Sequence, residues 1–334
     1  MTHTVAINGF GRIGRLVFRH IMESENELEI VAINDIAPLD NLAYLLRFDS
    51  VHAKPKEKIG AKNGTLQWGS QEVRFLSERD PANLPWEEME VDLAIEASGL
   101  FTKREEASKH LKAGAGRVLV TAPAKGADFT VCMGVNDKDY KPEEHKIVSN
   151  ASCTTNCLAP VAKVLDENFG IETGFLTTVH AYTSSQAIVD APNKKMRRGR
   201  SAAVSIVPTT TGAAIATTKV LPQLEGKMDG LAMRVPVVDG SIIDFVAETE
   251  KPVTVDKVNQ AFRQAAQTDG MKGVLGITDD ELVSTDIVDS TYSALVDAQS
   301  TMTLGEHTVK VLAWYDNEWG YSRRVADLAA YMLQ

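Results

Sequence analysis

The sequence predicts an α/β protein built from two domains. Its 334 residues exceed one small domain and suit two of ordinary size. In the first half, short apolar runs alternate with helix-like segments, which is typical of βαβ units and a mainly parallel sheet. After roughly residue 150 the apolar runs become longer and follow one another closely. We therefore expect a doubly wound parallel sheet, followed by an α+β domain with a mixed or antiparallel sheet.

The first half supplies the strands of the expected parallel sheet. Thr4–Asn8 is a short apolar run, and a glycine-containing turn joins it to a helix expected over Arg12–Glu23. Leu28–Asn34 is a second buried strand. Lys58–Leu76 carries an Asn-Gly turn between β-prone segments, which predicts a hairpin at the edge of the sheet. Later runs of the buried-strand type are Val91–Ala97, Arg117–Thr121, Thr130–Gly134 and Lys146–Ser149.

The second half has a different pattern. A helix is expected over Thr154–Glu167 and a strand over Gly174–His180. The segment from Thr183 to Ser205 is polar and basic with little periodicity, and loops of that length in a compact domain are usually functional or bridge subunits. Two adjacent long strands joined by an Asp-Gly turn are expected next, then a third strand and a final helix: Leu231–Val238, Ser241–Glu250, Thr308–Tyr315 and Trp319–Leu333.

Charge and composition exclude several classes of protein. The 35 basic and 45 acidic residues give a formal net charge of −10, so general nucleic-acid affinity is not expected. The dense basic run Lys194–Arg200 is interpreted as a solvated loop or a subunit contact, with a nucleic-acid patch as the alternative. Three cysteines, Cys132, Cys153 and Cys157, lack the spacing of a disulfide framework. The start has no secretory pattern and no run of about 18 apolar residues occurs, so we expect a cytoplasmic protein without a membrane partner.

A nucleotide-binding motif follows the first expected strand. Residues 9–14 read GFGRIG, a match to G-x-G-x-x-G with a strand before it and a helix after it. Gly9 permits the tight turn, Gly11 lets a pyrophosphate approach the backbone, and Gly14 lets helix and strand pack closely. Asp35, at the end of the second strand, can accept hydrogen bonds from a ribose and disfavours a 2′-phosphate. The pattern indicates a Rossmann-type domain that binds NAD, and the alternative is that the glycines serve only a turn and Asp35 a helix cap.

A cysteine stands where a second strand meets a helix. Cys153 falls in the first helical turn after Ser149, where the free N–H groups and the helix dipole favour a thiolate nucleophile. Taken alone, a cysteine in this position is more often structural. Cys157, one turn further on, is interpreted as a packing residue, and no second ligand pair indicates a metal site. His180 is the candidate base, although spacing alone does not pair it with Cys153.

Six motifs occur in order along the chain: NGFGRIGR at 8–15, SNASCTTN at 149–156, HAYT from His180, PTTTGAA at 208–214, MRVP at 233–236 and WYDNEWGYS at 314–322. In these motifs the chain resembles, from end to end, the glyceraldehyde-3-phosphate dehydrogenase family in its phosphorylating, NAD-dependent form. The stretch Ser184-Ser185-Gln186 departs from the family's common Asn-Asp-Gln beside the expected substrate-phosphate site. Asp35 and Pro192 favour NAD, and some use of NADP stays open.

The resemblance implies a role for each matching residue. Cys153 is the nucleophile and His180 the base. The residues implied to bind NAD are Asn8, Gly9, Gly11, Arg12, Ile13, Asp35, Arg79, Ser98, Thr121, Asn317 and Tyr321. Thr183 and Arg234 are implied to bind the substrate phosphate, with a contribution from Arg198. The residues implied to bind inorganic phosphate are Ser152, Thr154, Thr211 and Gly212.

The resemblance also implies an activity and an assembly. The activity is oxidation of D-glyceraldehyde 3-phosphate, with NAD and inorganic phosphate, to 1,3-bisphosphoglycerate and NADH through a cysteine thioester, a glycolytic step. The NAD-binding domain is expected over residues 1–152 and completed by a C-terminal helix at 317–334, with the catalytic domain over 153–316. A homotetramer is expected, with the basic loop across a subunit interface. The alternatives are an erythrose-4-phosphate dehydrogenase and a non-catalytic NAD-binding or interaction protein of the same fold.

Overall fold

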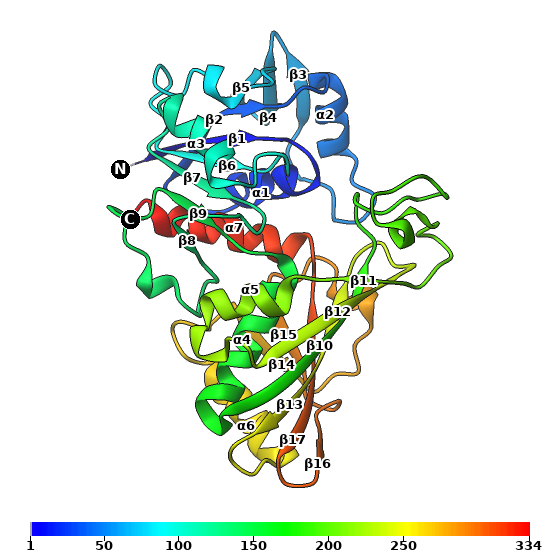
Figure 1. The fold of residues 1–334 in the computed structure, drawn as a ribbon. Coiled ribbons are helices and arrows are strands. Elements are labelled where there is room, and N and C mark those ends of the chain that lie inside the picture. Colours follow the sequence, from blue (N-terminus) through cyan, green and yellow to red (C-terminus); the bar gives the residue numbers. More distant parts are fainter. Residues whose placement is uncertain (1) are drawn as a thin grey trace. The chain divides into compact units, whose positions relative to one another are not determined.

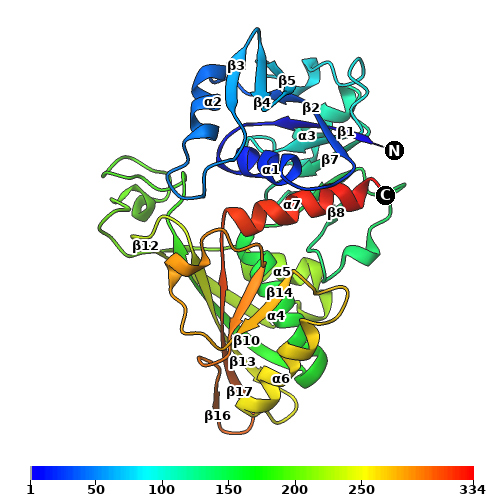
Figure 2. The ribbon, with the colours of Figure 1, turned by 180° about the vertical axis from the view of Figure 1, so that it is seen from behind.

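The computed structural model describes residues 2–334, and the chain divides into two compact units (Figures 1 and 2). The first unit consists of the chain up to Val131 together with Lys138–Ala151 and Ser322–Gln334. The second unit consists of Cys132–Asp137 and Ser152–Tyr321. Each unit has its own sheet, and the expected α/β class with two sheets is confirmed.

The first unit is built on a nine-stranded sheet in the order β3-β4-β5-β2-β1-β6-β7-β9-β8. All its neighbouring strands run parallel except at the β3–β4 and β4–β5 pairs, which are antiparallel. Asn63 and Gly64 form the β3–β4 turn with φ of 51° and 77°, so the expected edge hairpin is confirmed. The strands are β1 (His3–Asn8), β2 (Leu28–Asn34), β3 (Ile59–Lys62), β4 (Thr65–Trp68), β5 (Gln71–Leu76), β6 (Leu93–Glu96), β7 (Arg117–Val120), β8 (Phe129–Thr130) and β9 (Ile147–Ser149).

Helices connect the parallel strands of this unit, as right-handed βαβ crossovers require. They are α1 (Arg12–Met22), α2 (Leu39–Arg47) and α3 (Arg104–Lys112), with the short 3₁₀ segment η1 (Pro81–Asn83). Helix α1 buries one face, and its Phe18 makes edge-on contacts with Phe10 and Trp68, each at 5.4 Å between ring centroids. The C-terminal helix α7 (Trp319–Met332) contributes its residues from Ser322 onward to the same unit.

The second unit contains an eight-stranded mixed sheet in the order β11-β12-β10-β13-β17-β15-β14, with β16 paired to β17. The β10–β12 and β14–β15 pairs are parallel and the others antiparallel. The strands are β10 (Ile171–Ala181), β11 (Val207–Thr210), β12 (Met228–Val235), β13 (Ser241–Thr249), β14 (Leu275–Thr278), β15 (Ala294–Asp297), β16 (Met302–Leu304) and β17 (Thr308–Tyr315).

One expected pairing in the second unit is wrong. The two strands on either side of Asp239-Gly240 are not neighbours, because β10 lies between β12 and β13. The turn is therefore a crossover rather than a hairpin. Gly240 is required there for a different reason: its φ is 83°, and a Cβ would come within 2.2 Å of the Ser284 carbonyl oxygen.

Within residues 2–334, helices cover one face of the mixed sheet, and apolar side chains on the other face are exposed. Helices α4 (Cys153–Phe169), α5 (Ala213–Val220) and α6 (Val255–Ala265) lie on the same side (Figure 2), with α4 against β10, β13, β15 and β17. Alternation along the strands directs other side chains outward, and Phe175 on β10 is 70% exposed. The remaining short 3₁₀ segments are η2 (Asp137–Asp139), η3 (Met196–Gly199), η4 (Pro222–Leu224) and η5 (Ser284–Ile287). Among residues 2–334, no helix combines the length and the apolar character needed to span a membrane.

Candidate active site

A pocket of about 270 Å³ opens at the carboxyl ends of the parallel strands in the first unit. This is where open α/β sheets bind nucleotides. Six of the residues expected to bind NAD line it, namely Asn8, Gly9, Gly11, Asp35, Arg79 and Ser98. Six further residues that were not predicted from the sequence also line the pocket: Asn34, Ile36, Glu78, Ala97, Leu100 and Phe101. Ile36 and Leu100 are exposed and give the pocket apolar walls, which suit the faces of a base.

The three glycines of the motif have separate roles in the structure. Gly9 has φ of 93°, and a Cβ there would lie 2.4 Å from the Ser98 nitrogen. A Cβ on Gly14 would lie 2.0 Å from the Gly9 carbonyl oxygen, so helix α1 packs against the turn only without a side chain. Gly11 has nothing within 4 Å of its Cβ position and lines the pocket. The backbone is thus open to a ligand at the start of α1, as a pyrophosphate requires.

Asp35 fixes the entrance of the motif turn and still presents a carboxylate to the pocket. Its Oδ2 accepts the Phe10 N–H at 2.7 Å, and its Oδ1 accepts the Ala37 N–H at 2.9 Å. Each oxygen retains a lone pair for a ribose hydroxyl. The residues present therefore fit NAD.

Three of the residues expected to bind NAD are engaged elsewhere in the first unit. The Arg12 guanidinium is paired with Asp49 Oδ2 at 2.5 Å. Ile13 lies in the first turn of α1, and the Thr121 hydroxyl donates to the Glu96 carbonyl oxygen at 3.1 Å. None of these three side chains lines the pocket. Asn317 and Tyr321 belong to the second unit, where both are buried.

Cys153 is the first residue of helix α4 and lies beside His180. Ser152 caps the helix, because its Oγ accepts the Thr155 N–H at 3.1 Å. The Cys153 Sγ is 3.5 Å from His180 Nε2. His180 Nδ1 is 2.7 Å from the Ala181 carbonyl oxygen, which can only accept, so the ring proton lies on Nδ1. Nε2 is left as an acceptor facing the thiol, which is the tautomer that a general base needs.

Burial determines the resting protonation of this pair. It raises the pKa of the Cys153 thiol, although the charge of Arg234 and the Thr154 N–H oppose the rise. Burial, together with the charge of Arg234, lowers the pKa of His180 to about 3. A resting thiolate, expected from the helix start alone, is therefore not what the structure favours. For the half-buried Cys153 and the buried His180, the surroundings favour a thiol and a neutral imidazole over an ion pair.

A buried hydroxyl cluster supports the cysteine and the histidine from behind. The Tyr315 hydroxyl is 2.9 Å from Thr154 Oγ1 and 2.8 Å from Thr178 Oγ1. The Tyr315 ring meets the His180 ring edge-on, with centroids 5.9 Å apart. Thr154, expected to contact inorganic phosphate, thus has its hydroxyl directed at Tyr315. No spacing in the sequence pointed to Tyr315, which comes from the distant strand β17.

Cations and hydroxyls gather around the same end of the mixed sheet. His180 and Arg234 are register partners on the parallel strands β10 and β12, so their side chains lie side by side. Arg234 Nη1 donates to the Ala181 carbonyl oxygen at 2.9 Å and to Thr183 Oγ1 at 3.2 Å. Its buried Nε has no hydrogen-bond partner within residues 2–334. An unpaired guanidinium donor beside a hydroxyl is the chemistry of an anion site.

Arg198 is a second cation close enough to influence His180 and Arg234. Its Nε donates to Thr209 Oγ1 at 3.0 Å and its Nη1 to Ser185 Oγ at 3.3 Å. Thr211 accepts the Ala213 N–H at 3.2 Å, and Gly212 precedes α5 directly. Asn317 accepts a hydrogen bond from Ser241 Oγ at 2.6 Å. The contacts of Arg198 with Thr209 and Thr210 hold the basic loop against β11.

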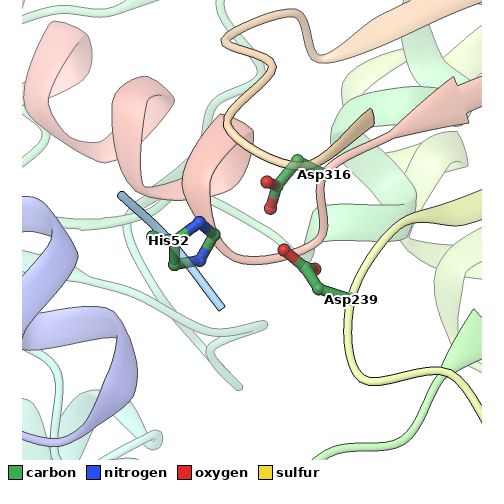
Figure 3. A group of neighbouring side chains, drawn as sticks. All are labelled: His52, Asp239 and Asp316. Carbon is green, nitrogen blue, oxygen red and sulfur yellow. The ribbon is translucent and has the colours of Figure 1, made fainter. Parts of the chain in front are cut away.

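Two buried carboxyl groups, which no sequence pattern predicts, also lie together in the second unit. Asp239, in the β12–β13 crossover, and Asp316, after β17, point toward one another (Figure 3). Asp316 accepts the backbone N–H groups of Glu318 and Trp319. Burial and the negative charge of Asp316 raise the pKa of Asp239 to about 9. A protonated Asp239 at neutral pH follows from these surroundings.

A nucleotide-type pocket in one unit and a cysteine–histidine pair in the other are features expected of nucleotide-dependent oxidoreductases that use a cysteine. Two family models match the chain: the NAD binding domain of glyceraldehyde 3-phosphate dehydrogenase over residues 3–104, and the C-terminal domain of the same enzyme over residues 152–317. The glyceraldehyde-3-phosphate dehydrogenase of Streptomyces coelicolor is 51% identical over 332 residues, covering 99% of each chain. That of Geobacillus stearothermophilus is 52% identical, covering 99% of this chain and 98% of the relative. The chain belongs to the glyceraldehyde-3-phosphate dehydrogenase family.

Proposed function

We propose that this protein oxidises D-glyceraldehyde 3-phosphate with NAD and inorganic phosphate, giving 1,3-bisphosphoglycerate and NADH. The observation that carries the proposal is the 3.5 Å approach of Cys153 Sγ to an acceptor nitrogen of His180. Bound NAD supplies the hydride acceptor. The pocket around Gly11 and Asp35 supports this choice of cofactor, since it pairs open backbone with a carboxylate.

The reaction begins with proton transfer from Cys153 to His180 Nε2. The thiolate sulfur then adds to the aldehyde carbon, and His180 returns the proton to the carbonyl oxygen, which gives a hemithioacetal and a neutral imidazole. His180 accepts the proton of the new hydroxyl as the carbon gives up its hydride, and a thioester on Cys153 remains. Phosphate oxygen attacks the thioester carbon, the C–S bond breaks, and the Cys153 thiolate is released with the acyl phosphate as product. Water must be kept from the thioester, because hydrolysis would forfeit the phosphoryl product.

The other site residues are proposed to hold the two anions and the cofactor. Thr183 and Arg234 bind the substrate phosphate, and the unpaired Nε of Arg234 supports this role. Arg198 assists from the basic loop. Inorganic phosphate is assigned to Ser152, Thr154, Thr211 and Gly212, and the remaining NAD contacts to Arg12, Ile13, Arg79, Ser98, Thr121, Asn317 and Tyr321.

We also propose a homotetramer in the cytoplasm. Each chain has an NAD-binding domain over residues 1–152 and 317–334 and a catalytic domain over residues 153–316. The uncovered face of the mixed sheet supports association, because it exposes Phe175, Leu231 and Val246 in the single chain. Apolar side chains gathered on one sheet face are typical of subunit interfaces. The basic loop is proposed to lie across a second interface.

The test is NADH formation from NAD and glyceraldehyde 3-phosphate by the purified protein, with and without inorganic phosphate. Sustained turnover that requires phosphate is the expected result. Turnover that ignores phosphate, with erythrose 4-phosphate as the better substrate, would transfer the assignment to the erythrose-4-phosphate dehydrogenase. NAD binding without any turnover would leave the non-catalytic alternative.

A further inference from the structure

A chain of buried polar side chains crosses the first unit along the carboxyl ends of its central strands. Asn34, Asn8 and Glu96 end β2, β1 and β6, which are consecutive neighbours in the sheet. Asn34 Nδ2 donates to Asn8 Oδ1 at 2.7 Å, and Asn8 Nδ2 donates to Glu96 Oε2 at 2.5 Å. All three side chains are buried. A carboxylate in this position is costly unless its oxygens are fully hydrogen-bonded.

Helix α3 supplies a further donor to this carboxylate. His110 is buried, and its Nε2 lies 3.0 Å from Glu96 Oε2. The Trp86 indole N–H donates to His110 Nδ1 at 3.0 Å. Because an indole nitrogen can only donate, Nδ1 is the acceptor and the ring proton is on Nε2. Trp86 thus fixes the tautomer in which a neutral His110 donates to Glu96.

The second oxygen of Glu96 holds the turn after β6. Its Oε1 accepts the Ser98 backbone N–H at 2.8 Å and also the Ser98 hydroxyl. Glu96 therefore accepts hydrogen bonds from four donors, two on each oxygen, contributed by Asn8, Ser98 and His110. Removing any of them leaves the buried carboxylate short of a partner.

The network lies directly behind the nucleotide pocket. Asn8, Asn34 and Ser98 line that pocket, whereas Glu96 and His110 do not. Asn34 also holds the loop after β5, since its Nδ2 donates to the Glu78 carbonyl oxygen at 2.9 Å and its Oδ1 accepts the Glu78 N–H at 2.8 Å. The pocket residue Arg79 follows immediately. The network around one buried carboxylate thereby fixes three residues that line the pocket, namely Asn8, Asn34 and Ser98.

We propose that Glu96 and His110 are positioning residues that preorganise the adenosine half of the NAD site. The inference rests on the proposed use of NAD. A pocket whose polar walls are already fixed loses less conformational freedom when the ligand binds, so affinity depends on residues that never touch it.

Binding of ADP-ribose, measured by calorimetry, tests the inference apart from the chemical step. In Glu96→Gln an NH₂ group replaces one acceptor oxygen and faces donors instead. We expect the Kd for ADP-ribose to rise about tenfold or more. Losses of this size are typical when a residue that orients the ligand-binding groups, without touching the ligand, is replaced. The KM for NAD should rise by the same factor, while kcat at saturating NAD stays within about twofold.

A pair of variants at His110 separates positioning from filling of space, and also covers the case in which Glu96→Gln does not fold. His110→Gln retains a donor toward Glu96, whereas His110→Phe removes it. His110→Phe should weaken ADP-ribose binding as Glu96→Gln does, and His110→Gln should restore most of the affinity. Val118→Ala is the matched control, because Val118 is buried on β7 against Ala107 of α3 and lies outside the pocket.

The outcomes are distinguishable. Failure of the unaltered protein to bind ADP-ribose would overturn the proposed function itself. Normal binding by Glu96→Gln and His110→Phe would overturn only the positioning role. Equal weakening in Val118→Ala, at a matched loss of Tm, would overturn it too, because a general loss of stability would then explain the effect.

Discussion

Replacement of His180 by asparagine separates its role as a base from its role as a hydrogen-bonding side chain. The amide of His180→Asn can still donate toward the Ala181 carbonyl oxygen, which His180 Nδ1 reaches at 2.7 Å. It presents no basic nitrogen to Cys153, whose Sγ now faces Nε2 at 3.5 Å. A positioned general base contributes roughly 10²–10⁴-fold, which corresponds to about 3 to 5 kcal/mol of transition-state stabilisation. We expect kcat to fall by that factor.

The same variant changes how stability depends on pH. Burial, aided by the charge of Arg234, lowers the pKa of His180 from its ordinary 6.5 to about 3. Between these values the unfolded chain binds one proton more than the folded chain, so the stability of the unaltered protein falls as the pH falls from 6.5 toward 3. The full shift corresponds to at most about 5 kcal/mol at 1.36 kcal/mol per unit. His180→Asn should lack this loss.

The two effects are measured by steady-state NADH formation and by denaturant unfolding at several pH values. His307→Asn is the control, because His307 is exposed in the same unit and its Nδ1 also lies 2.8 Å from a backbone carbonyl oxygen, that of Thr249. The control should leave both properties unchanged. A His180→Asn variant with more than a tenth of the original kcat would refute the assignment of the base. An acid-unfolding profile that matches the unaltered protein would refute the burial argument.

Three other perturbations give further tests. Burial and Asp316 raise the pKa of Asp239 to about 9, so the unaltered protein loses stability as the pH rises toward that value. Asp239→Asn should therefore stabilise the fold, relative to the unaltered protein, more at pH 8 than at pH 4. Denaturant titrations at both pH values check this, and an equal effect of the substitution at the two pH values would contradict it. Gly9→Ala should destabilise the protein by about 1 to 3 kcal/mol, with a matching fall in Tm, because φ is 93° and the Cβ would lie 2.4 Å from Ser98; an unchanged Tm would count against the tight turn. Phe175→Ser, on the uncovered sheet face, should lower the molar mass measured by light scattering, and an unaltered tetramer would exclude that face as an interface.

The sequence was informative wherever a local rule determines a local structure. The mainly parallel character of the first sheet followed from alternating strand and helix patterns, and Asn63-Gly64 marked its hairpin. The Asp239-Gly240 prediction failed because a turn dipeptide does not reveal that β10 inserts between the two strands. The Asp-Gly dipeptide predicts the turn, but the pairing of strands across the sheet determines whether the turn joins neighbouring strands.

The site was less predictable for a similar reason. Cys153 and His180 are 27 residues apart and meet only because α4 packs against β10, which no spacing rule encodes. Glu96 and His110 were overlooked because one ends an apolar strand and the other lies on a polar helix. Neither pattern shows that the two side chains meet in the interior. The raised pKa of Cys153 was likewise hidden, since the helix start suggests a thiolate and only the packed structure shows the burial.

If oxidation passes through a thioester on Cys153, that intermediate can be trapped and identified. The protein is mixed with NAD and glyceraldehyde 3-phosphate without inorganic phosphate, quenched in acid, and analysed by peptide mass spectrometry. A thioester mechanism predicts an acyl adduct on the peptide that carries Cys153, absent from the Cys132 peptide and discharged when phosphate is added before the quench. NADH formation with no adduct on Cys153, or with an adduct that phosphate does not discharge, would contradict it.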